Sequence, residues 1–144
     1  AIFSAGLLMP VGFEYGFTRK LDVVHTAPED WEETDTDLTG FITEVNAIKR
    51  ADPTLNSEGR WELLTTYDAP TIVLLKTSNA GDPVVVAINK DWRAAQSCRL
   101  PDLGAVCPGP LRAARPCVGG TPVQVPGQAT LQLEPAEIVL LSRS

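Results

Sequence analysis

The chain has 144 residues, of which 44% are hydrophobic and 21% charged, a composition typical of one globular domain of ordinary size. This composition excludes wholesale disorder, collagen and a coiled coil, and no apolar run approaches the roughly 20 residues of a membrane span. The formal net charge is −6 and there is no basic cluster, so neither nucleic acid nor a membrane is expected as a partner. A neutral ligand such as a sugar is compatible with this charge.

The first predicted element is a short, almost continuously apolar run at residues 7–13. Such a run is typical of a strand that is buried on both faces of a parallel sheet. Parallel strands need neighbours and crossover helices, which the rest of the sequence does not supply. We therefore expect the chain to be part of a longer protein. Its start at Ala1, without Met and without the basic region of a signal peptide, agrees with an interior stretch.

A polar segment follows at residues 14–37, and we expect a long loop with a short helical turn at residues 28–31. Loops of this length in compact domains are usually functional or mobile. The acidic cluster of this loop lacks the ligand spacing of an EF-hand, so a solvated loop is favoured over a calcium site. No Ser or Cys in a nucleophile-elbow context accompanies His25, which favours a loop histidine over an acid or base.

An amphipathic helix is predicted at residues 38–51. Apolar residues recur there at intervals of three and four and form one stripe: Leu38, Phe41, Ile42, Val45 and Ile48. Residues 35–37 can cap its start, Lys49 suits its negative end, and Pro53 prevents its continuation. Gly40 costs helix stability, which predicts a close packing contact at that position.

After a turn at residues 56–59 the pattern changes to short β-rich runs that are separated by turn residues. We expect strands at residues 61–65, 71–77, 83–89, 98–100, 123–125, 129–133 and 137–141. The run at residues 83–89 is expected to be a central strand. Short strands with frequent turns and no helices between them indicate an antiparallel β-sandwich, so the fold class is mostly β.

The cysteines are Cys98, Cys107 and Cys117, an odd number without the paired C-x-x-C spacing of structural zinc. We expect free thiols in a reducing cytosol, and neither a metal nor another cofactor. The Pro- and Gly-rich stretch at residues 101–120 predicts an irregular loop.

Glu14 and Tyr15 lie where the predicted buried strand gives way to the loop. In a parallel barrel this end of a strand is the active-site face, and Gly12 and Gly16 let the backbone turn sharply there. Glu14 has two interpretations: part of an active-site wall that helps to hold a sugar, or a carboxylate that only ties the loop to backbone N–H groups. Glycoside chemistry needs two facing carboxylates, and no second one is convincingly placed, so no catalytic residue is predicted.

Three tryptophans are candidates for sugar stacking. Trp61 and Trp92 flank predicted strands, which favours packing in the core or between domains for both. For Trp31, in the acidic loop, no such packing is predicted.

The string MPVGFEYG at residues 9–16 resembles the eighth-strand motif of the alpha-amylase superfamily (glycoside hydrolase family 13). Residues 41–55 resemble the eighth barrel helix of that family with its Pro-x-Leu exit, and residues 131–141 resemble the final hairpin of its C-terminal β-domain. Three motifs are most similar to the maltosyltransferases that extend alpha-1,4-glucans from alpha-maltose 1-phosphate: GFEYG at 12–16, LDVV at 21–24 and PEDWE at 28–32.

The resemblance implies that residues 1–58 are the last strand, loop and helix of a TIM (β/α)8 barrel and residues 59–144 a C-terminal antiparallel β-sandwich domain. It also implies a retaining double displacement whose three carboxylates lie on upstream strands, so this chain alone is expected to be inactive. Glu14, Tyr15 and Arg19 are then expected near the substrate, with Glu14 as structural support. The insert at residues 101–120 departs from the family pattern.

The expected partners are an alpha-glucan or maltooligosaccharide and the remainder of the barrel, in the cytoplasm; a homo-oligomer is a further possibility. Two alternatives stay open: a non-catalytic carbohydrate-binding or interaction module, and a piece of an amylase-type hydrolase. A self-contained module would bury residues 7–13 and the helix stripe within this chain. Exposure of both is expected where a partner is missing.

Overall fold

The computed structural model describes residues 2–22, 24–104, 107–108, 111–116, 123–125 and 129–143, with the backbone alone at 123–125. In this described part the helices are α1 (Thr39–Ala51) and the 3₁₀ helices η1 (Phe13–Tyr15), η2 (Pro28–Asp30) and η3 (Pro53–Asn56). The strands are β1 (Gly59–Leu63), β2 (Thr71–Ser78), β3 (Pro83–Asn89), β4 (Gln96–Arg99), β5 (Leu111–Ala114), β6 (Val123–Val125), β7 (Thr130–Leu133) and β8 (Ile138–Arg143).

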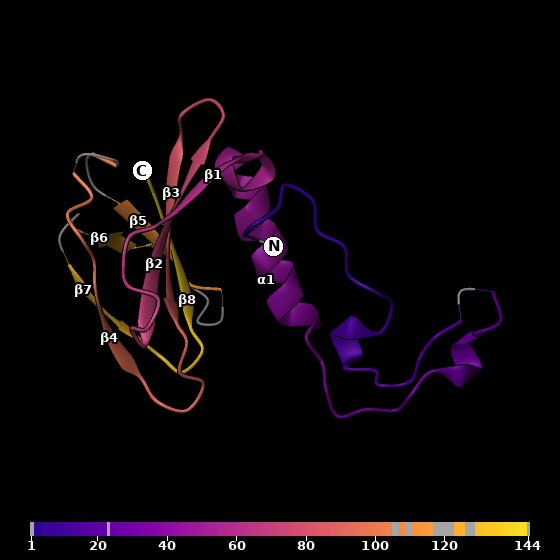
Figure 1. Ribbon diagram of the computed structural model, residues 1–144. Coiled ribbons are helices and arrows are strands. Elements are labelled where there is room, and N and C mark those ends of the chain that lie inside the picture. Colours follow the sequence, from indigo (N-terminus) through magenta and orange to yellow (C-terminus); the bar gives the residue numbers. More distant parts are fainter. Residues whose placement is uncertain are drawn as a thin grey trace.

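The strands form two sheets with antiparallel pairing throughout (Figure 1). The larger sheet has the order β1-β2-β3-β8-β5-β6, and the smaller sheet pairs β4 with β7. β3 is a central strand, because Val85 lies opposite Leu75 of β2 on one side and opposite Leu141 of β8 on the other. The predicted antiparallel sandwich and its central strand at residues 83–89 are therefore confirmed.

The space between the two sheets holds the main hydrophobic core. Alternate residues of β2, β3 and β8 point into it, as the two-residue period of a strand requires, and they meet Cys98 of β4 and Leu133 of β7. Val85, Cys98 and Leu133 are completely buried. Full burial of one aliphatic side chain stabilises the folded state by about 1.5–3 kcal/mol relative to exposure.

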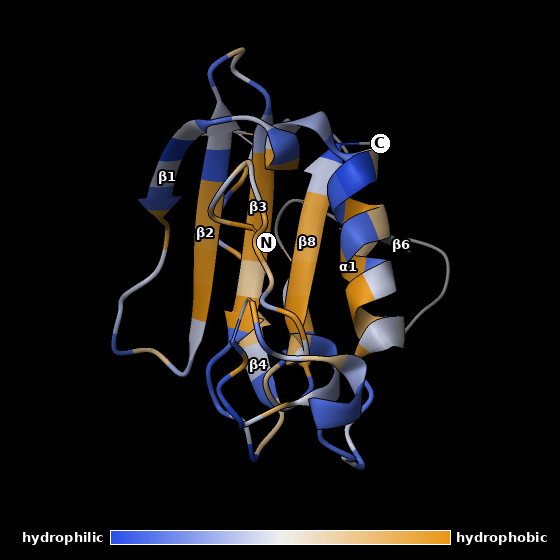
Figure 2. Cartoon of the chain, turned by 90° about the vertical axis from the view of Figure 1, so that its right-hand side faces the viewer, coloured by the Kyte–Doolittle hydropathy of each residue, from blue (hydrophilic) through white to orange (hydrophobic). Residues whose placement is uncertain are grey.

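The opposite face of the large sheet is covered by the helical part of the chain. Leu74, Val86 and Leu140 form a second apolar cluster with Leu55 of η3, and Ile48 of α1 packs against it. Figure 2 shows the apolar middle of β2, β3 and β8, with α1 beside β8. The molecule therefore has three layers: the small sheet, the large sheet and the helical part.

The helix α1 begins one residue later than predicted, at Thr39, and ends at Ala51 before Pro53, as predicted. The Asp37 carboxylate accepts hydrogen bonds from the Thr39 hydroxyl at 2.6 Å and the Thr39 N–H at 2.9 Å. These bonds, the hydroxyl bond first, hold the pKa of Asp37 below its ordinary value. The described part of the chain contains no helix that is long and apolar enough to cross a membrane.

Lys49 lies in the last turn of α1, as predicted, but its side chain is buried, and its Nζ donates to the carbonyl oxygens of Ser4 at 2.9 Å and Leu55 at 2.6 Å. Burial lowers the pKa of Lys49. Gly40 makes no close packing contact with the described residues, because nothing lies within 4 Å of the position that a Cβ would take.

Residues 7–13 do not form the predicted strand. Residues 7–10 are irregular, and η1 begins at Phe13. Leu8 is 93% exposed and Val11 64%. A parallel strand needs hydrogen-bonding neighbours along its edges, and no strand among those described lies beside this segment.

The stretch at residues 101–120, predicted as an irregular loop, contains the strand β5. The alternation of completely buried Leu111 with exposed Arg112 fits a strand, but the surrounding prolines and glycines mask this pattern. Cys98 and Cys107 are free and buried, and burial raises the pKa of both thiols. Cys117 lies outside the described residues, as do residues 105–106, 109–110 and 117–120 of this stretch.

Candidate functional site

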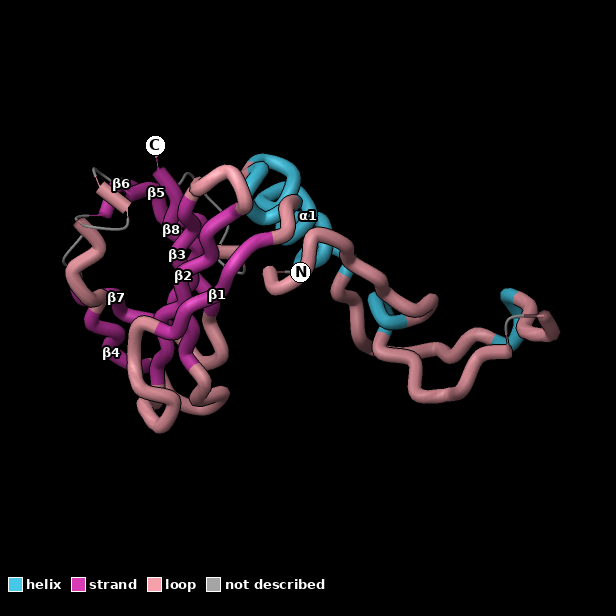
Figure 3. Tube along the Cα trace, turned by 45° about the horizontal axis from the view of Figure 1, so that its top comes forward, coloured by secondary structure: helices cyan, strands magenta, loops and turns pink. Residues whose placement is uncertain are grey.

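The candidate site is the loop at residues 12–38, which leads from η1 to α1 and extends away from the sandwich (Figures 1 and 3). Two glycines with left-handed backbone conformation flank η1, Gly12 at φ 86° and Gly16 at φ 66°. A Cβ on Gly12 would lie 2.1 Å from Cδ2 of Phe17. Only glycine therefore allows the Phe17 ring to lie against the backbone at this position.

Two hydrogen bonds close the base of the loop at the start of α1. The Leu38 N–H donates to the carbonyl oxygen of Glu14 at 2.7 Å, and the Thr34 hydroxyl donates to the carbonyl oxygen of Tyr15. The carboxylate of Glu14 makes no hydrogen bond with any described residue. The main chain of Glu14 thus ties the loop, and its half-buried side chain is left available for another group.

The distal part of the loop is held by Glu32. Its carboxylate accepts hydrogen bonds from the Thr18 N–H at 2.7 Å, the Thr18 hydroxyl at 3.0 Å and the Arg19 N–H at 2.8 Å. Arg19 also donates from its guanidinium Nη1 to the carbonyl oxygen of Asp30 at 3.2 Å. We call these contacts between residues 18–19 and 30–32 the Glu32 clasp. The hydrogen bond from the Arg19 N–H is the largest cause that holds the pKa of Glu32 below its ordinary value.

Tyr15, Phe17 and Trp31 form a row of aromatic rings along the loop. The ring centroids of Tyr15 and Phe17 are 5.9 Å apart and those of Phe17 and Trp31 are 6.2 Å apart, both within the normal range for aromatic pairs. Trp31 is 47% exposed and Tyr15 37%. Accessible rings beside carboxylates can bind a ligand that has apolar C–H faces and hydroxyl donors.

The structure brings Glu14, Tyr15 and Arg19 into this one loop but gives them different environments. Glu14 and Tyr15 lie in η1 at the base, whereas Arg19 is engaged in the Glu32 clasp. His25 lies in a turn whose N–H groups bond to the Asp22 carboxylate, which lowers the pKa of Asp22, so a loop histidine is confirmed. No three His, Cys, Asp or Glu side chains among the described residues are grouped so that they could hold a metal ion.

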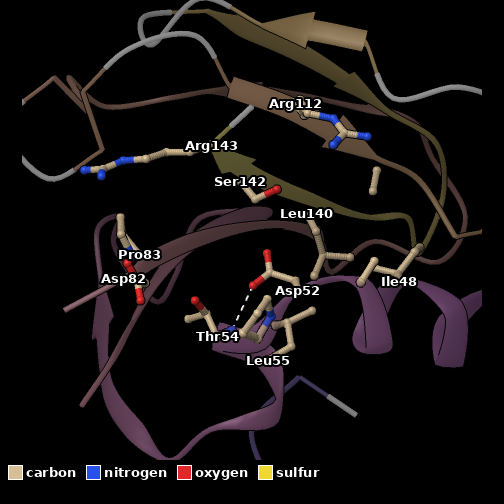
Figure 4. A pocket seen from close by; sticks show the side chains of 13 residues that line it. Ile48, Asp52, Thr54, Leu55, Asp82, Pro83, Arg112, Leu140, Ser142 and Arg143 are labelled. Atoms are coloured by element: carbon tan, nitrogen blue, oxygen red, sulfur yellow. Dashed lines mark hydrogen bonds between the residues drawn. The ribbon is translucent and has the colours of Figure 1, made fainter. Parts of the chain in front are cut away.

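A pocket of about 350 Å³ lies elsewhere, at the junction of η3 with the large sheet (Figure 4). Its charged lining residues are Asp52, Asp82, Arg112 and Arg143. The Asp52 carboxylate already accepts a hydrogen bond from the Thr54 N–H at 2.9 Å. None of the predicted site residues and no aromatic ring lines this pocket, so it is separate from the loop.

An apolar hollow of about 230 Å³ lies between residues 7–13 and the helix stripe. Its lining includes Leu8, Met9, Phe41 and Val45, and Phe41 is 43% exposed. Contiguous exposed apolar surface of this kind marks an interaction site. Residues 7–13 and Phe41 of the helix stripe are therefore only partly covered by the described chain, whereas Ile48 of the stripe packs against the large sheet.

Sequence reasoning did not identify Phe17 as part of the site. The signal that could have found it is Gly12, whose missing Cβ makes room for the Phe17 ring. Packing is confirmed for Trp61, which contacts Phe3 with ring centroids 4.9 Å apart. Trp92 is not in the core of this chain, because it is 69% exposed and lies beneath the Arg93 guanidinium at 4.2 Å from the ring centroid; its packing between domains stays a prediction.

Comparisons with known proteins agree with the resemblance noted in the sequence. No protein-family model matches the chain. In an alignment of 100 positions that covers 63% of the chain, it is 32% identical to the alpha-1,4-glucan:maltose-1-phosphate maltosyltransferase of Burkholderia pseudomallei (strain K96243), of which it spans 9%. The crystal structure of AmyP in complex with maltose matches 70% of this chain and 19% of the AmyP chain, with a TM-score of 0.51 and 14% identity. The resemblance to a C-terminal portion of the alpha-amylase superfamily is confirmed.

Proposed function

We propose that this chain is the C-terminal part of an alpha-glucan-active enzyme that transfers maltosyl units from maltose 1-phosphate to glucan ends. In this proposal residues 1–58 are the last strand, loop and helix of a (β/α)8 barrel, and residues 59–144 are the C-terminal sandwich domain. The identity to a maltosyltransferase supports this choice of reaction. The free thiols of Cys98 and Cys107 support the cytoplasm as its location.

The observation that carries the proposal is the exposed apolar surface of residues 7–13 and the helix stripe. Leu8, Val11 and Phe13 are at least half exposed, although their sequence is that of a strand buried on both faces. The other strands of a parallel barrel would supply the missing neighbours and cover the apolar hollow between Leu8 and Phe41. A self-contained binding module would have no reason to leave this surface open.

Glu14, Tyr15 and Arg19 are proposed to border the substrate cleft. The free carboxylate of Glu14 can accept a hydrogen bond from a sugar hydroxyl, and the exposed ring of Tyr15 can pack against a sugar face. Arg19 acts through the Glu32 clasp, which sets the shape of the loop around that cleft.

The reaction proposed for the whole protein is a retaining double displacement. An aspartate would displace phosphate from C1 of the maltosyl donor, and a glucan hydroxyl would then displace the aspartate. The resemblance puts the aspartate nucleophile and the two other carboxylates on strands upstream of this sequence. What this chain contributes is binding and closure of the barrel, so it is expected to be inactive alone.

The test is incubation of the full-length protein with maltose 1-phosphate and a maltooligosaccharide. We expect phosphate release in step with longer glucan products, and no release by residues 1–144 alone. Hydrolysis without chain extension would replace the transferase by an amylase-type hydrolase. Sugar binding by residues 1–144 with no reaction by any longer product of the gene would support the non-catalytic module instead.

A further inference from the structure

Residues 14–37 concentrate both aromatic rings and negative charge. This stretch contains eight of the 18 Asp and Glu residues and two of the 12 Lys and Arg residues, so it carries the whole formal charge of −6. The exposed rings of Tyr15 and Trp31 lie within it, with Phe17 between them. Solvation accounts for the acids, whereas neighbouring exposed rings form a contiguous apolar surface of the kind that marks a binding site.

The rings are held in place and are not loosely exposed. Phe17 lies directly against the Gly12 backbone, where any Cβ would clash with its ring. The residues before and after Trp31 are acids that already accept hydrogen bonds. The Asp30 carboxylate accepts a hydrogen bond from the Ala27 N–H at 3.0 Å, and the Glu32 carboxylate forms the clasp with residues 18–19. A surface that is ordered before the ligand arrives loses less entropy when it binds.

The surroundings of the rings select the charge of the ligand. Acidic side chains repel a phosphate, whereas they accept hydrogen bonds from neutral hydroxyls. Of the two basic residues in the stretch, Arg19 is already engaged at the Asp30 carbonyl oxygen. The row of rings therefore suits a neutral sugar chain better than a sugar phosphate.

We propose that Tyr15, Phe17 and Trp31 form a stacking platform for the neutral acceptor glucan, and not for the phosphorylated donor. This inference rests on the proposed function, whose two substrates differ in charge. Successive glucose units present C–H faces to the rings and donate hydroxyl hydrogens to the carboxylates beside them. Trp31, the most exposed of the three rings, contributes most to acceptor binding.

The experiment measures the dissociation constant of maltoheptaose by calorimetry in the full-length protein and in single variants. We expect Trp31→Ala to weaken maltoheptaose binding about tenfold and Trp31→Phe to restore most of it, because the ring face is retained. Trp92→Ala is the matched control, since Trp92 is an exposed tryptophan of the sandwich, and it is expected to leave binding unchanged. The KM for maltose 1-phosphate is expected to stay within twofold in all three variants.

The inference is overturned if Trp31→Ala binds maltoheptaose as tightly as the unaltered protein, or if it raises the KM for the donor as much as it weakens acceptor binding. If Trp31→Ala lowers the melting temperature as well as maltoheptaose binding, the Trp31 ring is packed against the rest of the protein and is not available to a sugar. This result also overturns the inference. Failure of the proposed function gives a different result. Maltoheptaose binding would then still depend on Trp31, but incubation with maltose 1-phosphate would release no phosphate.

Discussion

Residues 2–58 and residues 59–143 both contain strongly apolar segments, but only the second region buries them. Among the described residues of the first region, burial is confined to Gly12, Lys49, Thr54 and Leu55. In the second, the central strand β3 is buried along almost its whole length, because β2 and β8 pair with its edges and the small sheet and η3 cover its faces.

The difference shows that an apolar sequence specifies burial only if its hydrogen-bonding neighbours are present. β3 obtains both neighbours from strands of the same region. Residues 7–13 are no less apolar, yet no described strand pairs with them, and they remain irregular. The strands of the second region therefore pair with one another and take cover for one face from η3, whereas residues 7–13 have no pairing strand among the described residues.

The largest expected effect is the difference in stability between two leucine substitutions, one in each region. Leu133→Ala removes a completely buried side chain from the core between the sheets and is expected to lower the free energy of unfolding by about 2–5 kcal/mol. Leu8→Ala, at a side chain that is 93% exposed, is expected to change it by less than about 0.5 kcal/mol. Urea unfolding of both variants of residues 1–144 measures the difference. Equal losses would show that Leu8 is buried within this chain, which would contradict the comparison of the two regions.

A smaller effect is expected at the ion pair that closes the sandwich. Arg115 contacts the Glu137 carboxylate at 2.6 Å, and Glu137 is only 4% exposed. Arg115→Met leaves a buried carboxylate with one hydrogen bond, from the Glu134 N–H, and is expected to cost about 1–3 kcal/mol in the same assay. The control is Arg60→Met at the solvent-exposed pair with Glu62, which should cost less than about 0.5 kcal/mol. Similar losses for the two variants would contradict this ranking.

Gly40 tests whether a partner covers α1. In this chain Gly40→Ala should stabilise the fold by about 0.5–1 kcal/mol, because a helical Ala loses less entropy and the Cβ enters open space. In the full-length protein the gain should disappear if the rest of the barrel packs against this face. Melting temperatures of both lengths, with and without the substitution, measure the change. A gain of equal size in both would argue against a covering partner.

The smallest effect concerns the pH dependence of the candidate site. The pKa of Glu32 lies below its ordinary value, so the Glu32 clasp is intact above that value of about 4.3 and opens as the pH falls through the lowered pKa. Trp31 fluorescence should therefore change between pH 5 and strongly acidic solution. Glu32→Gln cannot undergo this titration and should lack that part of the change. An identical pH profile in the two proteins would reject the clasp as the cause.

Local sequence signals predicted most of the sandwich and the helix. β3 was predicted residue for residue and α1 to within one residue at its start, because turn residues, capping groups and apolar periodicity act over a few positions. β5 was missed, because prolines and glycines surround a four-residue strand whose pairing with β8 involves residues 26 to 32 positions away.

The candidate site was only partly predictable for the same reason. Glycines and a carboxylate at the end of an apolar run identified Glu14 and Tyr15. The contact of Phe17 with Gly12, the Glu32 clasp and the position of Trp31 depend on residues that are up to 14 positions apart. No local pattern records which backbone N–H a distant carboxylate will bind.

By itself, the sequence determined the antiparallel strands, the amphipathic helix and the acidic character of the loop, since these follow from residue period and composition. Only the tertiary structure decided that residues 7–13 remain unpaired, that Lys49 is buried between Ser4 and Leu55, and that three rings line up along the loop. Pairing, burial and ring contacts depend on groups that are distant in sequence, and their free energy is realised only when the folded chain brings those groups together.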